Sequence, residues 1–90
     1  MAWDCATGNG QTAKDLAPYF KKVMATDISE KQLSNALSIS NVFYSVQAAE
    51  KTDFEDDSFD LVTVSQALHW FDFDLFYKEL NRVTRNNGWF

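Results

Sequence analysis

The sequence is poor in the residues that mark several large classes of protein. It contains one cysteine, Cys5, so no internal disulfide can form, and the apolar residues around it indicate a buried free thiol. A reducing, cytoplasmic setting fits this cysteine usage. No apolar run approaches the roughly 18–20 residues that cross a membrane, and the N-terminus lacks the basic and apolar regions of a signal peptide. We therefore expect a cytoplasmic protein with no membrane partner.

Basic residues are also scarce. Eight lysines and arginines stand against 13 aspartates and glutamates, which gives a net charge of -5. Clustered positive charge is what binds the phosphates of nucleic acids, so this balance argues against a nucleic-acid partner. The composition is otherwise that of a globular protein, with 46% hydrophobic and 16% aromatic residues. No repeat or linker divides the chain, so we expect one domain over residues 1–90.

Short apolar runs at strand spacing alternate along the chain with segments at helical spacing. The predicted strands cover residues 1–5, 23–26, 41–47 and 59–65, and the predicted helices cover residues 11–20, 29–38 and 72–85. The run 59–65 is apolar and β-branched, which is typical of a central parallel strand. Pro18 should end or kink the first helix in its last turn, because it removes a backbone donor. This alternation predicts an α/β fold, a parallel sheet with helices on both faces.

The end of the chain predicts a helix and the start of a fifth strand. Helical spacing places five apolar residues on the face that packs on the sheet: Phe73, Phe76, Tyr77, Leu80 and Val83. Residues 86–88 (Asn-Asn-Gly) have the form of a helix stop, and Trp89 and Phe90 begin the next strand. Such a short fifth strand leaves one edge of the strand 59–65 largely unpaired. We therefore expect self-association through that edge.

Residues suited to ligand binding follow the predicted strands, at the edge where open parallel sheets bind ligands. After the first strand, Gly8 and Gly10 allow a tight turn and let a ligand approach the backbone. The helix that follows favours a carboxylate at its N-terminus. After the second strand, the carboxylate of Asp27 can accept hydrogen bonds from both hydroxyls of a ribose. An acid at this position can equally serve a turn or the start of a helix.

The third and fourth strands are followed by weaker signals. Residues 47–50 (Gln-Ala-Ala-Glu) offer small side chains against which a flat ring can lie. Residues 65–70 (Ser-Gln-Ala-Leu-His-Trp) bring polar and aromatic side chains to the middle of the sheet, where a reacting group would be held. His69 is the only histidine and a candidate general base, although a histidine beside Trp70 also suits packing or a helix start. We predict no metal site.

The glycine turn admits a second interpretation. Gly8, Gly10 and Ala13 fit the relaxed fingerprint of dinucleotide-binding proteins, and Asp27 follows at about the right distance. Asp4 before the glycines, and the lack of a further glycine for the pyrophosphate, speak against a nicotinamide enzyme. Asp4 instead suits a ligand with a cationic amino group. On the residues alone, both interpretations stay open.

Five segments together resemble a known family. They are WDCATGNGQ, VMATDIS, VQAAEKTDF, DDSFDLVTVSQALHWFD and FYKELNRVTRNNGWF, and their order and spacing are similar to those of class I S-adenosylmethionine-dependent methyltransferases. Within that class they resemble the small-molecule group related to trans-aconitate methyltransferase. The resemblance implies a Rossmann-like sheet of strand order 3-2-1-4 with the start of strand 5. It also implies a partial domain over residues 1–90, the cofactor-binding half, because family members carry a leading helical segment and further strands.

The resemblance implies S-adenosylmethionine as the cofactor and gives the glycine turn a role. Asp4, Gly8 and Gly10 would hold the methionine portion, in a turn that also contains Ala6 and Thr7. Ala6 departs from the family, in which a glycine is usual at this position. The departure costs little if the backbone angles of Ala6 are ordinary.

The other segments would hold the rest of the cofactor and the substrate. By the same resemblance, Asp27 would bond the ribose hydroxyls and Ile28 would pack against adenine. Ala49 would offer its backbone amide to adenine, with Glu50 beside it, whereas Ala48 replaces an acid that commonly bonds the adenine amine. The residues that would line the sulfonium end are Ser65, Gln66 and Ala67. The residues that would face a small-molecule methyl acceptor are His69 and Trp70.

Three functions follow as hypotheses. The first is methyl transfer to a small-molecule acceptor, with little activity in the 90-residue chain alone. The second is a noncatalytic or incomplete fragment that binds the nucleoside. The third is the NAD(P)-binding domain of an oxidoreductase. The residues do not identify the methyl acceptor, because one fold and one family accommodate many different substrates.

Overall fold

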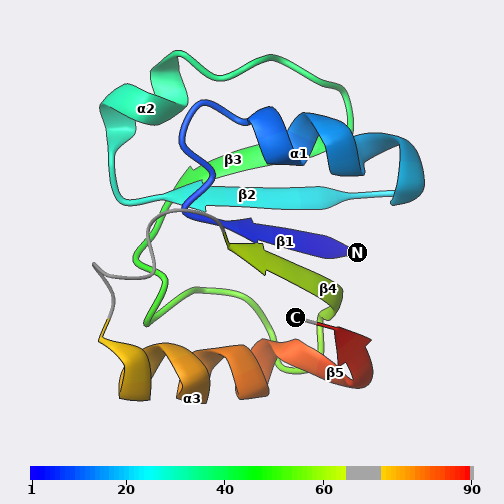
Figure 1. Ribbon diagram of the computed structural model, residues 1–90, viewed down its shortest axis with the longest axis vertical. Coiled ribbons are helices and arrows are strands. Elements are labelled where there is room, and N and C mark those ends of the chain that lie inside the picture. The colour runs from blue at the N-terminus through cyan, green and yellow to red at the C-terminus, as the bar shows by residue number, and fades with distance from the viewer. Residues whose placement is uncertain (65–71, 90) are drawn as a thin grey trace.

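The computed structural model describes residues 1–64 and 72–89. Within this part of the chain, five strands form one parallel sheet in the order β3-β2-β1-β4-β5 (Figure 1). The strands are β1 (Ala2–Cys5), β2 (Val23–Asp27), β3 (Val42–Val46), β4 (Phe59–Val64) and β5 (Thr84–Trp89). The helices are α1 (Gln11–Leu16), α2 (Glu30–Ser34) and α3 (Phe73–Val83), with a 3-10 turn at Ala17–Tyr19. The predicted α/β class and strand order are confirmed.

The two faces of the sheet carry different side chains, because successive strand residues point to opposite faces. One face packs against α1, and its buried side chains are all small: Ala2, Ala13, Ala17, Val23, Ala25 and Val42. The other face packs against α3, and it holds the large buried side chains as well as smaller ones. Its buried residues are Trp3, Cys5, Ala49, Phe59, Val62, Phe76, Leu80 and Val83. We call these the α1 face and the α3 face. Figure 1 shows α1 and α3 on opposite sides of the sheet, which confirms helices on both faces.

An aromatic cluster fills the α3 face. The rings of Trp3 and Phe54 lie edge to face with centroids 5.6 Å apart, and those of Phe54 and Phe59 do so at 4.9 Å. The indole N–H of Trp3 donates to Thr26 Oγ1 at 2.9 Å, so the buried ring leaves no unpaired donor. Because Phe54 belongs to the connection between β3 and β4, the cluster also anchors that connection to the sheet.

The first two helices end where local chemistry ends them. As predicted, Pro18 closes the first helix, which becomes a 3-10 turn at Ala17–Tyr19. Ser29 followed three residues later by Gln32 has the sequence of a capping box, and Ser29 does cap α2 by accepting from the Gln32 amide at 3.3 Å. The predicted extension of α2 to residue 38 is wrong, since the helix ends at Ser34. The Asn35 side chain donates to the carbonyl of Lys31 at 3.2 Å, which replaces a helical partner of that carbonyl and favours a turn.

The predicted boundary between the last helix and the fifth strand is also wrong. Residues 86–88 do not stop a helix before a strand at Trp89; β5 already begins at Thr84 and follows α3 directly. Phe59 pairs with Thr84 and Leu61 pairs with Trp89, with a shift of register between them. The extra residues on β5 form an irregularity of the kind that bends a strand. β4 therefore has a neighbour on the edge that we expected to be unpaired, and the stated reason for self-association no longer holds.

The buried face of α3 differs from the face that the spacing of its apolar residues predicted. Phe76, Leu80 and Val83 are buried as predicted, but Phe73 and Tyr77 are 46% and 47% exposed. These two rings stack on each other at the margin of the face, with centroids 6.3 Å apart. Their expected burial is therefore wrong, because the helix is turned so that Glu79 takes a buried position at 7% exposure. The buried face of α3 thus includes one charged residue, Glu79, and leaves two predicted aromatic residues at its margin.

The burial of the single cysteine and the short lengths of the helices agree with the sequence-based expectations. Cys5 is free and fully buried, as predicted, and burial raises the pKa of its thiol. No helix among residues 1–64 and 72–89 is long and apolar enough to cross a membrane.

Candidate functional site

The turn from β1 to α1 contains the three left-handed residues Ala6, Gly8 and Gly10. Their φ angles are +55°, +60° and +88°. The Thr7 amide donates to the Thr26 carbonyl at 2.8 Å, which holds the turn against β2, and the Gly10 amide donates to the Thr7 carbonyl within the turn at 3.0 Å. The sequence therefore places its glycines where the backbone needs them, with one exception at Ala6.

Ala6 does not have the ordinary backbone angles that would make the loss of a glycine cheap. Its φ of +55° lies in the left-handed region. An L-residue with a Cβ atom pays roughly 1–2 kcal/mol there relative to its normal conformation. The surrounding turn holds Ala6 in this conformation, so the departure from the family pattern stores strain next to the candidate site.

Gly8 and Gly10 have different surroundings. A Cβ atom added to Gly8 would meet no atom of residues 1–64 and 72–89 within 4 Å, so within the described part of the chain this position faces open space. A Cβ atom added to Gly10 would lie 2.6 Å from the hydroxyl oxygen of Tyr44. Tyr44 is itself fixed, because its hydroxyl donates to the Leu37 carbonyl at 2.7 Å. Gly10 thus serves packing, whereas Gly8 leaves room beside the backbone.

Asp4 lies beneath the turn rather than on its surface. Its side chain is 1% exposed, and it accepts from the hydroxyls of Thr7 at 2.6 Å and Thr63 at 2.8 Å. Burial raises the pKa of Asp4, while these hydroxyl bonds and the backbone of Ala13 oppose the rise. Asp4 thereby joins β1, the turn and β4. The spacing of Asp4 and Thr7 was visible in the sequence, but Thr63 is a partner that only the sheet register brings opposite Asp4.

Asp27 closes the turn from the side of β2. Its Oδ2 accepts from the Gly8 amide at 2.9 Å and its Oδ1 accepts from the Ser29 amide at 2.8 Å. A carboxylate has about four acceptor positions, so both oxygens keep a free lone pair for a ligand hydroxyl. The turn role that the sequence left open is therefore present, and it is compatible with ribose binding.

An exposed apolar side chain follows Asp27. Ile28 is 74% exposed. Isoleucine is among the residues most often buried, and the next residue in the chain begins the cap of α2. Exposure directly beside Asp27 is what a side chain that packs on a ligand requires.

The connection after β3 completes the edge of the site. The Gln47 amide donates to the Asp27 carbonyl at 3.1 Å, and Ala48 forms a bridge with Lys51. Ala49 is buried on the α3 face, and Glu50 is half-buried. After burial, the further causes of the raised pKa of the Cys5 thiol are the carboxylates of Asp4, Glu50 and Asp27. Three acids from three segments therefore gather around the carboxyl end of β1.

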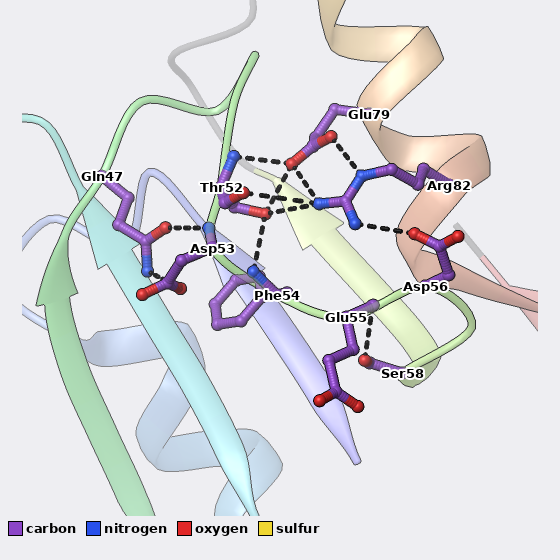
Figure 2. A network of polar contacts seen from close by, with 9 residues as sticks. All are labelled: Gln47, Thr52, Asp53, Phe54, Glu55, Asp56, Ser58, Glu79 and Arg82. Carbon is purple, nitrogen blue, oxygen red and sulfur yellow. Dashed lines mark hydrogen bonds and ion pairs between the residues drawn. The ribbon is translucent and has the colours of Figure 1, made fainter.

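A polar network that the sequence did not predict ties this connection to α3 (Figure 2). Its members on α3 are Glu79 and Arg82, and its members on the connection include Thr52 and Asp56. A signal did exist in the sequence, because Glu79 falls between Phe76 and the apolar residues that follow it on the buried face. An acid at such a position implies a buried partner.

The candidate residues after β4 lie outside the described part of the chain. They are Ser65, Gln66, Ala67, His69 and Trp70, together with Phe71. β4 ends at Val64, and Thr63 already contacts Asp4. The roles expected for this segment stay predictions.

The fold and the strand ends define a class of protein. A parallel sheet of order β3-β2-β1-β4-β5, with a glycine turn after β1 and an acid after β2, is a Rossmann-like nucleoside-binding arrangement. A family model described as "Methyltransferase domain" matches residues 3–90. The chain belongs to this family, the class I S-adenosylmethionine-dependent methyltransferases.

Individual relatives agree with this assignment. A Dictyostelium discoideum protein named as a methyltransferase is 47% identical over 88 residues, which cover 98% of this chain and 34% of the relative. The structure of an Anaeromyxobacter dehalogenans protein described as a type II methyltransferase matches with a TM-score of 0.92 and 42% identity, over 97% of this chain and 37% of that one. The YcgJ protein of Bacillus subtilis matches with a TM-score of 0.92 and 31% identity, over 97% and 40%. The chain thus spans between about a third and two fifths of these relatives.

Proposed function

We propose that this chain is the cofactor-binding half of an enzyme that transfers a methyl group from S-adenosylmethionine to a small-molecule acceptor. The family supports methyl transfer, and the net charge of -5 favours a small acceptor over nucleic acid. The buried free thiol of Cys5 fits a reducing, cytoplasmic location.

The observation that carries the proposal is the open space at Gly8. The turn presents backbone at a position where a Cβ atom would meet no atom of the described residues, and the amide of Gly8 is oriented by Asp27. Exposed Ile28 follows directly. Bare backbone, a carboxylate with free lone pairs and an apolar side chain together offer what a ribose and an adenine ring require.

Each residue of the site then has a proposed role. Asp4, Gly8 and Gly10 would hold the methionine portion, and Asp4 would also support the turn from beneath through Thr7. Asp27 would accept from the ribose hydroxyls, and Ile28 would pack on the adenine ring. The cofactor, when bound, supplies the electrophilic methyl group, and the protein contributes orientation.

The remaining roles follow the same scheme. Ala49 would donate its backbone amide to adenine, with Glu50 at the rim of the same pocket. Ser65, Gln66 and Ala67 would line the sulfonium end. His69 and Trp70 would face the acceptor, with His69 as a candidate general base.

Calorimetric titration of the chain with S-adenosylhomocysteine and, separately, with NAD tests the proposal. We expect a saturable heat of binding with the sulfur nucleoside and a much weaker response to NAD, because Asp4 and the missing third glycine disfavour a pyrophosphate. A preference for NAD would favour the dinucleotide interpretation. Binding of the sulfur nucleoside is expected both of the enzyme's cofactor-binding half and of a noncatalytic fragment, so this titration decides between these two and the dinucleotide interpretation.

A further inference from the structure

Glu79 of α3 is a buried charge whose hydrogen bonds are all satisfied. Its carboxylate accepts from the amide and the hydroxyl of Thr52, each at 2.6 Å, and from Nε and Nη2 of Arg82, each at 2.8 Å. Each oxygen therefore has a partner, because three of the four donors reach Oε2 and the Nε of Arg82 reaches Oε1. Figure 2 shows Glu79 and Arg82 projecting from α3 toward Thr52. Hydrogen bonding from Arg82 is the main reason that the pKa of Glu79 falls to about 2, so Glu79 stays charged.

Stability alone does not account for this ion pair. The desolvation of the buried Glu79 carboxylate cancels part of its attraction to the partly exposed Arg82, and an apolar pair of the same size often stabilises a fold equally well. Nor is the pair needed to hold the connection between β3 and β4 against α3, because backbone hydrogen bonds already do so. The amides of Asp57 and Ser58 donate to the carbonyls of Arg82 and Val83 at 2.9 and 2.8 Å. What Glu79 and Arg82 add is a fixed position for Thr52.

Thr52 stands at the base of the turn that carries the candidate adenine contacts. Its neighbour Asp53 is bound twice by the side chain of Gln47. The backbone amide of Asp53 donates to Gln47 Oε1 at 2.8 Å, and Gln47 Nε2 donates to Asp53 Oδ1 at 2.9 Å. Ala48 and Lys51 form a bridge above that base. Residues 48–51 are thus a short closed turn, with Gln47 and Asp53 at its base and Thr52 fixed to α3.

We propose that Glu79 and Arg82 are positioning residues for the adenine end of the ligand, acting through Thr52 on the backbone of residues 48–51. This inference rests on the proposed function, because it assigns those residues to the adenine contact. The pair touches no ligand itself. If Thr52 is released, the turn keeps its residues but loses the orientation of the Ala49 amide.

Matched variants separate this positioning from general stability. Thr52→Val removes the hydroxyl that donates to Glu79 and keeps the shape of the side chain, whereas Thr52→Ser keeps the hydroxyl. Arg82→Lys loses the two-pronged contact with Glu79, since an ammonium cannot reproduce the planar fork. Arg85→Lys is its control, because Arg85 is exposed and bonds only Asp60 among the contacts that the structure gives its side chain.

Two measurements on each variant test the proposal. In the free chain, hydrogen exchange at the amides of residues 49–53 should accelerate in Thr52→Val and Arg82→Lys and stay unchanged in Thr52→Ser and Arg85→Lys. Affinity for S-adenosylhomocysteine should fall about fivefold in the first pair, as for the loss of one hydrogen bond, and stay unchanged in the second pair. Global melting temperatures, recorded in parallel, should move less than the local exchange rates.

The outcomes are distinguishable. Unchanged exchange in Thr52→Val, or faster exchange with unchanged affinity, would overturn the inference. If the unmodified chain binds no S-adenosylhomocysteine, the proposed function fails before any substitution is made, and the ligand part of this inference fails with it. Faster exchange together with weaker binding in the first pair alone would support it.

Discussion

The α1 face and the α3 face of the sheet differ in the size of their buried side chains and in their relation to the site. On the α1 face, alanines and valines let the helix lie close, and this helix begins directly after the glycine turn. On the α3 face, Trp3, Phe59 and Phe76 fill a larger space. Large aromatic side chains contribute more free energy on burial than alanine or valine. The face that contributes most to stability is therefore not the face that shapes the ligand turn.

The two faces also reach the site by different routes. The α1 face reaches it through the turn itself, with Asp4 beneath and Gly8 at the open side. The α3 face reaches it through the connection between β3 and β4, which Phe54 anchors and Glu79 orients. Substitutions on the two faces should consequently separate stability from affinity.

The largest expected effect is on the α3 face. Phe59→Ala should lower the free energy of unfolding by about 3–5 kcal/mol, because it removes a fully buried ring and leaves a cavity beside Trp3. Val23→Ala, equally buried on the α1 face, should cost roughly 2 kcal/mol, since it removes only two methyl groups. Urea unfolding followed by circular dichroism gives both values. Equal losses would show that the two faces contribute alike.

The next effect concerns affinity. Asp27→Ala should weaken binding of S-adenosylhomocysteine by about 1.5–3 kcal/mol, because it deletes charge-assisted hydrogen bonds to the ribose and also frees the Gly8 amide. Asp27→Asn should lose less, since one carbonyl acceptor remains. Calorimetry on samples with unchanged circular dichroism measures the difference. An alanine variant with the affinity of the unmodified chain would rule out the ribose role.

Acid should separate the faces by the sign of its effect. The folded pKa of Glu79 is about 2, below its ordinary 4.5, so its stabilisation is complete above pH 4.5 and is lost as the pH falls toward 2. Asp4 has a raised pKa, so its protonation favours the folded state as the pH falls through that pKa toward 3.8.

Unfolding measured between pH 7 and pH 3 in the unmodified chain, Glu79→Gln and Asp4→Asn tests this contrast. Glu79→Gln should lose less stability on acidification than the unmodified chain, by about 1–3 kcal/mol at most. Asp4→Asn should lose more stability on acidification than the unmodified chain, because it lacks the Asp4 carboxyl whose protonation favours the folded state. Parallel pH profiles in all three proteins would contradict the assigned interactions.

The two glycines of the turn should respond in opposite ways. Gly10→Ala should destabilise the fold by roughly 1–3 kcal/mol, because its Cβ atom would overlap the Tyr44 hydroxyl. Gly8→Ala should cost about 1 kcal/mol of strain at a positive φ but should reduce affinity more strongly, since its Cβ atom would enter the open space. Melting curves and calorimetry on both variants reveal the crossover. Equal ratios of lost stability to lost affinity would mean that both glycines are structural.

The sequence predicted the parts of this molecule that local chemistry decides. Strand runs, the stop at Pro18 and the Ser29 cap are encoded by neighbouring residues, and the strand order followed from the family resemblance. The fifth strand was predicted to start at Trp89 and not at Thr84, because residues 86–88 are turn formers that become a strand only by pairing with β4. Glu79 was missed because its partner Thr52 lies 27 residues away.

The site was predictable to a similar extent. Asp27 and Gly8 stand where the motif placed them and are joined by a hydrogen bond. Thr63 and Tyr44 were not predicted, because the sheet register, and not the chain, brings them to Asp4 and Gly10. The φ of Ala6 was likewise not readable from the residue, since alanine gives no sign of a left-handed conformation.

The smallest expected effect follows from that angle. Ala6→Gly should stabilise the chain by about 1 kcal/mol, because glycine adopts a φ of +55° without the clash that a Cβ atom makes, and this gain exceeds the entropy that glycine adds to the unfolded state. The matched control is Ala25→Gly on the α1 face, where the backbone is an ordinary strand and the same change should destabilise by about 1 kcal/mol. Ala25 is fully buried and Ala6 is half-buried, so the decisive result is the gain in stability at Ala6, which loss of a methyl group alone does not produce. If Ala6→Gly instead lowers the melting temperature, the turn is not strained at Ala6.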